Sequence, residues 1–181
     1  MSMLDEGASF ADLNVSRIAE RAGRTRTAFY AHFEDRRHLL LALLERFGGD
    51  TLAALQPFLA ADGPISYADI EASTRAAFET FRKNATLIRA ATEAAGYDDE
   101  VADYWSSTVD QIIEGSQQRL LAEGLDAEHA RATATALAWM SERLTYQQVV
   151  REATDLDDEA AAAAISHVWW SSLHAASQGK P

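Results

Sequence analysis

The residues best suited to chemistry in this sequence are arginines that cluster near its start. Residues 16–38 hold six arginines against three acidic residues, so this stretch is locally basic. Arg26 and Thr27 follow a turn, and an arginine in such a place can donate two hydrogen bonds to guanine O6 and N7. An arginine cluster is otherwise an ordinary solvated surface, so the elements around it must decide between the two interpretations.

Two acidic clusters, at residues 98–100 and 155–159, suggest a different chemistry, because paired aspartates can hold Mg²⁺ in all-helical enzymes. Both clusters come directly before a predicted helix, where carboxylates cap free N–H groups and are favoured by the helix dipole. Capping is therefore the favoured interpretation. His129, His167 and His174 lack the spacing of a metal site, and no Ser-His-Asp set or glycine-rich phosphate loop occurs. The sequence predicts no metal, no cofactor and no enzymatic activity.

The basic residues lie on two predicted short helices joined by a tight turn, within residues 15–33. Ile18, Ala19 and Ala22 form one apolar stripe, and Gly23 is predicted to end that helix. Thr25 is predicted to cap the second helix, at about residues 26–32. This pattern is typical of the helix-turn-helix unit, whose second helix can enter the major groove of DNA.

Three strings here resemble the DNA-binding signature of TetR-type transcriptional repressors: A-x-R-A-G at 19–23, T-R-T-A-F-Y-A-H-F at 25–33 and D-R-R-H-L-L-L-A-L-L at 35–44. The resemblance implies DNA contacts from seven residues, namely Arg24, Thr25, Arg26, Thr27, Tyr30, His32 and Arg36. Of these, Arg26 and Thr27 match base-reading positions, and Tyr30, His32 and Arg36 match phosphate-contacting positions. Phe29 and Phe33 are expected in the core. Residues 1–6 match the tail of a first helix that is shorter than the family's.

Composition and periodicity predict helices throughout the chain. Of 181 residues only three are proline, there is no cysteine, and no apolar run is long enough to cross a membrane. We expect a cytoplasmic, all-α protein with no membrane contact. A long helix should run from Asp35 to about Leu55, before Pro57. Further helices are expected at residues 67–82, 85–95 (capped by Asn84), 99–123, 126–152 and 157–177.

These helices divide into two predicted parts. Residues 1–47 form an N-terminal helix-turn-helix DNA-binding domain, and residues 48–181 form a helical-bundle ligand-binding and dimerisation domain. Residues 1–46 carry seven arginines and seven acidic residues, so the whole net charge of −12 lies in the second part. Such a distribution lets the first part approach phosphates while the rest of the molecule is repelled.

The last two predicted helices, at about 127–152 and 157–177, carry apolar residues on more than one face, including Trp139, Val168 and Trp170. A terminal helix that is apolar on two sides must bury both of them. We therefore expect a homodimer through these helices, which would present two recognition helices to a palindromic DNA operator. A monomer with a thicker core is the alternative.

The second part also resembles the body of EthR-type repressors, on F-E-T-F at 78–81, D-E-V-A-D-Y-W-S-S at 99–107, A-L-A-W-M-S-E-R at 136–143 and H-V-W at 167–169. Carried over by position, the resemblance implies a ligand pocket lined by Ile70, Ser73, Ala77, Phe81, Trp105, Ile112, Ser116, Ala138, Met140, Ser141 and Trp169. Ala138 and Ser141 replace two asparagines that bind ligand there. The other interpretation is that these side chains are ordinary core, as aromatic residues at helical spacing usually are.

The predicted function is that of a ligand-responsive DNA-binding transcriptional regulator, a repressor released from its operator by a small apolar effector. Ligand in the body would shift the long helix after Asp35 and change the spacing of the two heads. The alternative is an all-helical carrier or enzyme for small molecules, in which the helix-turn-helix is vestigial.

Overall fold

The chain folds into α-helices joined by short loops. The structure, a computed structural model, describes residue 4, residues 10–59 and residues 63–178, with side chains up to residue 174. No strand occurs in these ranges. The helices are α2 (Val15–Arg21), α3 (Arg26–Tyr30), α4 (Arg36–Leu59), α5 (Tyr67–Lys83), α6 (Ala85–Ala95), α7 (Asp99–Ala122), α8 (Ala127–Val149) and α9 (Asp158–Gln178). The predicted all-α fold is confirmed.

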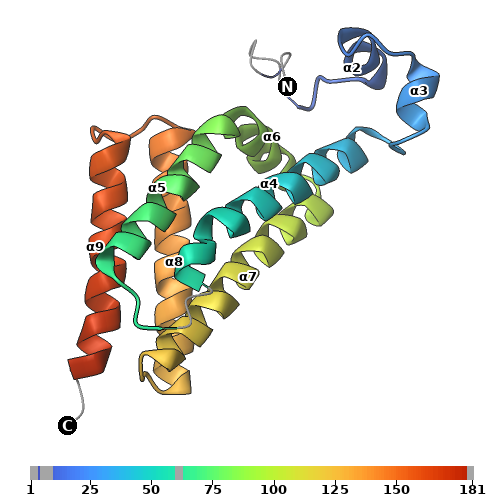
Figure 1. The fold of residues 1–181 in the computed structure, drawn as a ribbon. Coiled ribbons are helices and arrows are strands. Elements are labelled where there is room, and N and C mark those ends of the chain that lie inside the picture. The colour runs from blue at the N-terminus through green and yellow to red at the C-terminus, as the bar shows by residue number, and fades with distance from the viewer. Residues whose placement is uncertain (1–3, 5–9, 60–62, 179–181) are drawn as a thin grey trace.

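Helices α2 and α3 form a small head at one end of α4, which runs from the head into the body (Figure 1). With 24 residues, α4 spans about 36 Å at the usual helical rise. Its predicted end at Leu55 is wrong, because the helix continues through Pro57 to Leu59. A proline this close to the end of a helix removes only one backbone hydrogen bond. Burial of Phe58, which is 5% exposed, opposes that loss.

The body consists of α5 to α9 packed around the lower part of α4 (Figure 1). Helix α5 contacts α4 on one side and α9 on the other, while α7 contacts α4 and α8. Their facing stripes supply the fully buried aliphatic residues, such as Leu44, Ile70, Ile113 and Leu173. The body therefore has one continuous apolar core, and α4 is part of it.

Two further predicted helix ends lie two or three residues beyond those in the structure, and one predicted cap is absent. Helix α3 ends at Tyr30, before His32, and α8 ends at Val149, before Glu152. Glu152 has a φ of 49°, a left-handed conformation that a helix cannot continue through. Asn84 precedes α6 as predicted, but its side chain does not cap that helix. Its amide instead donates to the carbonyl of Thr80 at 2.8 Å.

The acidic clusters act as helix caps and ion-pair partners. The Asp98 side chain accepts from the backbone N–H of Val101, and the Asp157 side chain accepts from that of Ala160 at 2.7 Å. Asp158 pairs with Arg82. These contacts confirm the capping interpretation.

Within the ranges given above, no group of His, Asp and Glu residues is arranged to hold a metal ion. No helix in these ranges is long and apolar enough to cross a membrane.

The expected tail of a first helix falls on residues 1–6. Of these the structure describes only Leu4, which is helical and packs against the core. The rest of that prediction lies outside the described residues.

Candidate functional site

The turn between α2 and α3 is a Schellman motif. The N–H of Gly23 donates to the carbonyl of Glu20, and the N–H of Arg24 donates to the carbonyl of Ala19 at 2.8 Å. Gly23 has a φ of +64°, and a Cβ there would meet nothing within 4 Å. The left-handed backbone, and not a lack of space, therefore favours glycine at this position.

Helix α3 is capped at its start and packs through its inner face, while its outer face is exposed. The hydroxyl of Thr25 accepts from the N–H of Ala28 at 3.1 Å, as predicted. Phe29 is buried and lies 5.4 Å from Phe33, ring centre to ring centre, which fixes the inner face. Apart from Arg36, the predicted contact residues are all exposed: Arg24, Thr25, Arg26, Thr27, Tyr30 and His32.

Arg26 and Tyr30 are one helical turn apart and interact on the exposed face of α3. The Arg26 guanidinium donates to the Tyr30 hydroxyl at 3.4 Å and lies 5.7 Å from the ring centre. Tyr30 is 49% exposed, which is high for an aromatic side chain, and its ring meets that of Phe29 edge-on. The pair presents a cation and a hydroxyl side by side, both suited to base edges and phosphates.

Arg36 behaves differently from the predicted phosphate contact. It is half-buried, and its guanidinium donates to the backbone carbonyls of Phe10 (3.1 Å), Ala11 and Leu13 (2.8 Å). From the other side, the carboxylate of Glu93 on α6 accepts from the N–H groups of Phe10 and Ala11, each at 3.2 Å. Arg36 thus holds the segment before α2 in place. The sequence carries no signal for Glu93, since its partners lie 82 and 83 residues away.

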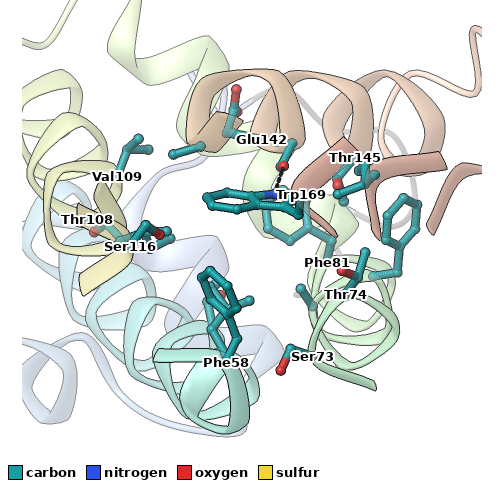
Figure 2. Close-up of a pocket in the computed structure, with 18 of the residues that line it drawn as sticks. Phe58, Ser73, Thr74, Phe81, Thr108, Val109, Ser116, Glu142, Thr145 and Trp169 are labelled. Atoms are coloured by element: carbon teal, nitrogen blue, oxygen red, sulfur yellow. Dashed lines mark hydrogen bonds between the residues drawn. The ribbon is translucent and has the colours of Figure 1, made fainter. Parts of the chain in front are cut away.

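The body contains a cavity of about 100 Å³ enclosed by α4, α5, α7, α8 and α9. Figure 2 shows Phe58, Phe81, Val109 and Trp169 around it. Phe58 meets Trp169 edge-on, with ring centres 5.0 Å apart, and Phe47 stacks on Trp105 at 6.0 Å. The walls are predominantly apolar, as in most small-molecule sites.

Ten of the eleven predicted pocket residues line this cavity: Ile70, Ser73, Ala77, Phe81, Trp105, Ile112, Ser116, Ala138, Ser141 and Trp169. Met140 does not line it. On α8 the lining residues are Ala138, Ser141, Glu142 and Thr145, whose spacing of three and four marks one helical face. Met140 is half a turn from Ala138 and lies on the other side.

The sequence interpretation missed Glu142, the one carboxylate among the described residues that line the cavity. Burial raises the pKa of Glu142, while neighbouring Arg143 and the Trp105 indole lower it. Ser141 was predicted as a ligand contact, but its hydroxyl already accepts from Trp169 Nε1 at 2.9 Å and donates to the carbonyl of Leu137 (Figure 2). Its hydrogen bonds lie within the protein.

Tyr104 on α7 connects the cavity with the helix that enters the head. Its ring lines the cavity. A Cβ at Gly48 on α4 would lie 3.0 Å from the Tyr104 hydroxyl, so the two helices approach closely there. Burial raises the pKa of Tyr104. Nearer the head, Arg37 on α4 pairs with Glu100 on α7 at 3.1 Å.

Helices α8 and α9 lie side by side on the far side of the body from the head (Figure 1). Several large apolar residues of these helices are buried within the chain, including Leu137, Val149, Ile165 and Leu173. Trp139 on α8 remains 40% exposed and Val168 on α9 remains 38% exposed.

A capped, exposed second helix of a helix-turn-helix, joined by one continuous helix to a body with an apolar cavity, defines a DNA-binding regulator of the helix-turn-helix class. The family described as "Transcriptional regulator EthR, C-terminal domain" matches residues 70–175, and "Bacterial regulatory proteins, tetR family" matches residues 7–43. The chain belongs to the TetR family of transcriptional regulators and has an EthR-type C-terminal domain. Members of this family bind DNA operators and, in general, small-molecule effectors.

Relatives of known name agree with this assignment. The HTH-type transcriptional regulator EthR of Mycobacterium tuberculosis is 29% identical over 183 residues, covering 93% of this chain and 81% of the relative. EthR of Mycolicibacterium smegmatis is 26% identical, with 93% and 80% covered. A TetR-family structure from Syntrophomonas wolfei has the same fold at 16% identity, with a TM-score of 0.73 and 94% and 88% covered. One from Rhodococcus sp. has a TM-score of 0.65 at 17% identity, with 91% and 89% covered.

Proposed function

We propose that this protein is a dimeric transcriptional repressor that binds a palindromic operator through α3 and leaves it when a small apolar effector enters the body cavity. The DNA-binding domain comprises residues 1–47 and the effector and dimerisation domain residues 48–181, so the boundary lies within α4. As a regulator of bacterial DNA, the protein would act in the cytoplasm.

The observation that carries the proposal is the exposed face of α3. Arg26 and Tyr30 project from a helix whose start is capped by Thr25 and whose inner side is fixed by Phe29. A short helix held in this way keeps its outer side chains in a fixed direction, as groove recognition requires. Arg24, Thr27 and His32 are exposed around the pair and are proposed as further DNA contacts.

The head and the cavity are joined by α4, which supports a mechanism of release. Phe47, Thr51, Leu55 and Phe58 of this helix line the cavity, while its first residue, Arg36, holds the segment before α2. A ligand that spreads the cavity walls would therefore tilt α4 and move α3 with it. The ligand favours one of two arrangements of α4, the one that binds DNA or the one that does not. It can lower operator affinity by no more than the difference between its own affinities for these two arrangements.

Dimerisation through α8 and α9 is supported by Trp139 and Val168, the exposed large apolar side chains on the described parts of these two helices. A two-fold pairing of α8 and α9 would bury both. It would also set the two copies of α3 at a fixed separation, near one turn of DNA or about 34 Å for adjacent half-sites. The relatives are named as regulators, which favours this function over a carrier or an enzyme.

The direct test selects genomic DNA fragments that the full-length protein binds and measures affinity for the selected site against salt concentration. Log K should fall linearly with log salt, since each phosphate contact releases counterions. Arg26→Ala should weaken specific binding about 10-fold or more if Arg26 reads a base, and Tyr30→Phe should weaken it less.

The matched control is Lys83→Ala, an exposed cation at the end of α5, in the body and outside the proposed dimer helices α8 and α9. It removes the same charge and should leave operator affinity nearly unchanged. Equal affinities for the wild type, Arg26→Ala and Tyr30→Phe would contradict the proposal.

A further inference from the structure

Two buried hydroxyls in the cavity have no hydrogen-bond partner among the residues that the structure describes. Ser73 on α5 is 2% exposed and Ser116 on α7 is fully buried, and both line the cavity. The Oγ atom of each is without a partner there. A buried hydroxyl without a partner is unfavourable and uncommon in folded proteins, so such a group in a cavity needs an explanation.

Other buried hydroxyls in the body show what the ordinary arrangement would be. Thr51 donates to the carbonyl of Phe47 at 2.9 Å, and Ser166 donates to that of Ala162 at 2.8 Å. Thr74, the neighbour of Ser73, donates to the carbonyl of Ile70 at 2.8 Å. A helical serine can make this bond to the residue four positions earlier. Ser73 and Ser116 do not make it, which leaves their hydroxyls available to a molecule in the cavity.

On α8, two of the positions that the family resemblance implies as ligand contacts offer little to a polar ligand. Ala138 has no polar side-chain atom, and the Ser141 hydroxyl is engaged by Trp169 and by the carbonyl of Leu137. The positions on α8 where the family resemblance implies ligand contacts therefore cannot supply a free hydrogen-bond donor in this arrangement. In the view of Figure 2, Ser73 and Ser116 appear on either side of Phe58, away from Glu142.

The charge of the walls restricts the ligand further. Among the described residues that line the cavity there is no arginine, lysine or histidine, and the one charged group is the carboxylate of Glu142. An anionic ligand would lose its hydration without gaining a counter-ion. The size of the cavity, about 100 Å³, also favours a molecule smaller than a typical drug-sized ligand.

We propose that the effector is a small neutral molecule with an apolar body and one hydroxyl or carbonyl oxygen, and that the hydroxyl of Ser73 or that of Ser116 binds this oxygen. This inference rests on the proposed function, because it assigns the chemistry of the effector in the same cavity. It places the polar contact on α5 or α7 instead of α8. Trp169, Phe58 and their neighbours then contact only the apolar part of the ligand.

The test uses three probes of nearly equal size: 1-hexanol, n-heptane and hexanoate. Their dissociation constants for the full-length protein are measured by the fluorescence of Trp105 and Trp169, which line the cavity. Ser73→Ala or Ser116→Ala, whichever removes the hydroxyl that binds the oxygen, should weaken 1-hexanol binding about five- to tenfold, as expected for one neutral hydrogen bond. Heptane binding should change less than about twofold in both variants, because heptane makes no hydrogen bond, and hexanoate should bind most weakly.

The matched control is Ser166→Ala, which removes a buried hydroxyl that does not line the cavity and already has its partner in Ala162. It should leave 1-hexanol binding unchanged. Unchanged heptane binding shows that a variant still forms the cavity.

The outcomes separate the two proposals. If 1-hexanol binds the wild type, and Ser73→Ala and Ser116→Ala bind it equally well, the assignment of the polar contacts is overturned while the cavity remains an effector site. Tight hexanoate binding would overturn the assignment of a neutral ligand. If no probe binds, the effector part of the proposed function fails together with this inference. Operator binding, measured separately, is independent of all three.

Discussion

Arg36 illustrates how one residue can fit a family position and yet do something else. Its three backbone acceptors lie on the segment before α2, and its guanidinium lies 5.4 Å from the Phe10 ring centre. A guanidinium can satisfy several carbonyls at once because its donors form a planar fork. The residue therefore supports the position of α2 and α3, and Glu93 completes that support from α6.

We predict that Arg36→Ala lowers the free energy of unfolding by about 1–2 kcal/mol, through the loss of charged hydrogen bonds. Operator affinity should fall, because the head is less well fixed. The slope of log K against log salt should stay the same, whereas loss of a phosphate contact reduces it by about one. Urea unfolding and salt titrations of both proteins measure these quantities, and a reduced slope would favour the phosphate contact.

Asp158 provides a prediction about pH. Hydrogen bonds from Arg82, and then from Gln148, hold the pKa of Asp158 below its ordinary value, against a smaller opposing effect of burial. A carboxyl whose pKa is lower in the folded state stabilises the fold at neutral pH. That stability is lost as the pH falls below about 4, the value in the unfolded chain, towards the lower folded-state pKa.

Asp158→Asn should therefore lower the free energy of unfolding at pH 7 by about 0.5–1 kcal/mol, a modest amount because the side chain is partly exposed. The difference from wild type should shrink as the pH falls below about 4. Urea unfolding from neutral to acidic pH checks the trend, and a constant difference across this range would contradict it.

At the scale of elements, α4 belongs to both parts of the molecule. It begins in the head, lines the cavity with residues from Phe47 to Phe58, and packs closely against Tyr104 of α7 at Gly48. Gly49 follows directly but faces open space, because a Cβ added there would meet nothing within 4 Å. The two adjacent glycines thus offer a matched pair of positions in one helix.

We predict that Gly49→Ala raises the free energy of unfolding by about 0.5–1 kcal/mol through helix propensity and leaves effector response unchanged. Gly48→Ala should gain less or lose stability, because its Cβ meets the Tyr104 hydroxyl at 3.0 Å. It should also change the effector concentration needed to release DNA. Combining Tyr104→Phe with Gly48→Ala in one protein should recover the free energy of unfolding that Gly48→Ala loses. Urea unfolding and operator release in these variants test this contact, and identical behaviour of the two alanine variants would contradict it.

For the whole molecule, charge and exposed apolar surface are distributed unevenly. The net charge of −12 lies outside residues 1–46. In Figure 1 the head lies at one side of the body and α8 and α9 at the other. A dimer formed through α8 and α9 would thus keep the acidic bodies together and leave both heads free for DNA.

Trp139→Glu should convert the proposed dimer into a monomer, because it introduces a charge where the two-fold interface would bury an indole. Sedimentation velocity measures the change, and operator affinity should fall with it. Tyr97→Glu is the matched control for sedimentation only, since Tyr97 is 56% exposed at the end of α6, outside α8 and α9, but lies near Glu93 and Arg36. A wild-type protein that sediments as a monomer would contradict the proposed interface.

Local patterns in the sequence determined the helices, the turn at Gly23 and the caps at Thr25, Asp98 and Asp126, because each depends on residues within one turn of one another. Ten of the positions that the family resemblance implies as ligand contacts line the cavity. Met140 lies off the face of α8 that lines the cavity, because a position carried over from the family does not include the orientation of the helix. Arg36 donates to backbone carbonyls of the segment before α2.

The remaining features were decided by tertiary structure. Glu93 meets Phe10, the Ser141 hydroxyl is taken by Trp169, and Tyr104 meets Gly48 only because helices distant in sequence pack together. Such contacts depend on the angle and register of packed helices, which helical periodicity within one segment does not encode. The sequence alone thus determined the class of protein and its elements, and the packing of α4 to α9 decided which side chains face the cavity and which of their hydroxyls remain available.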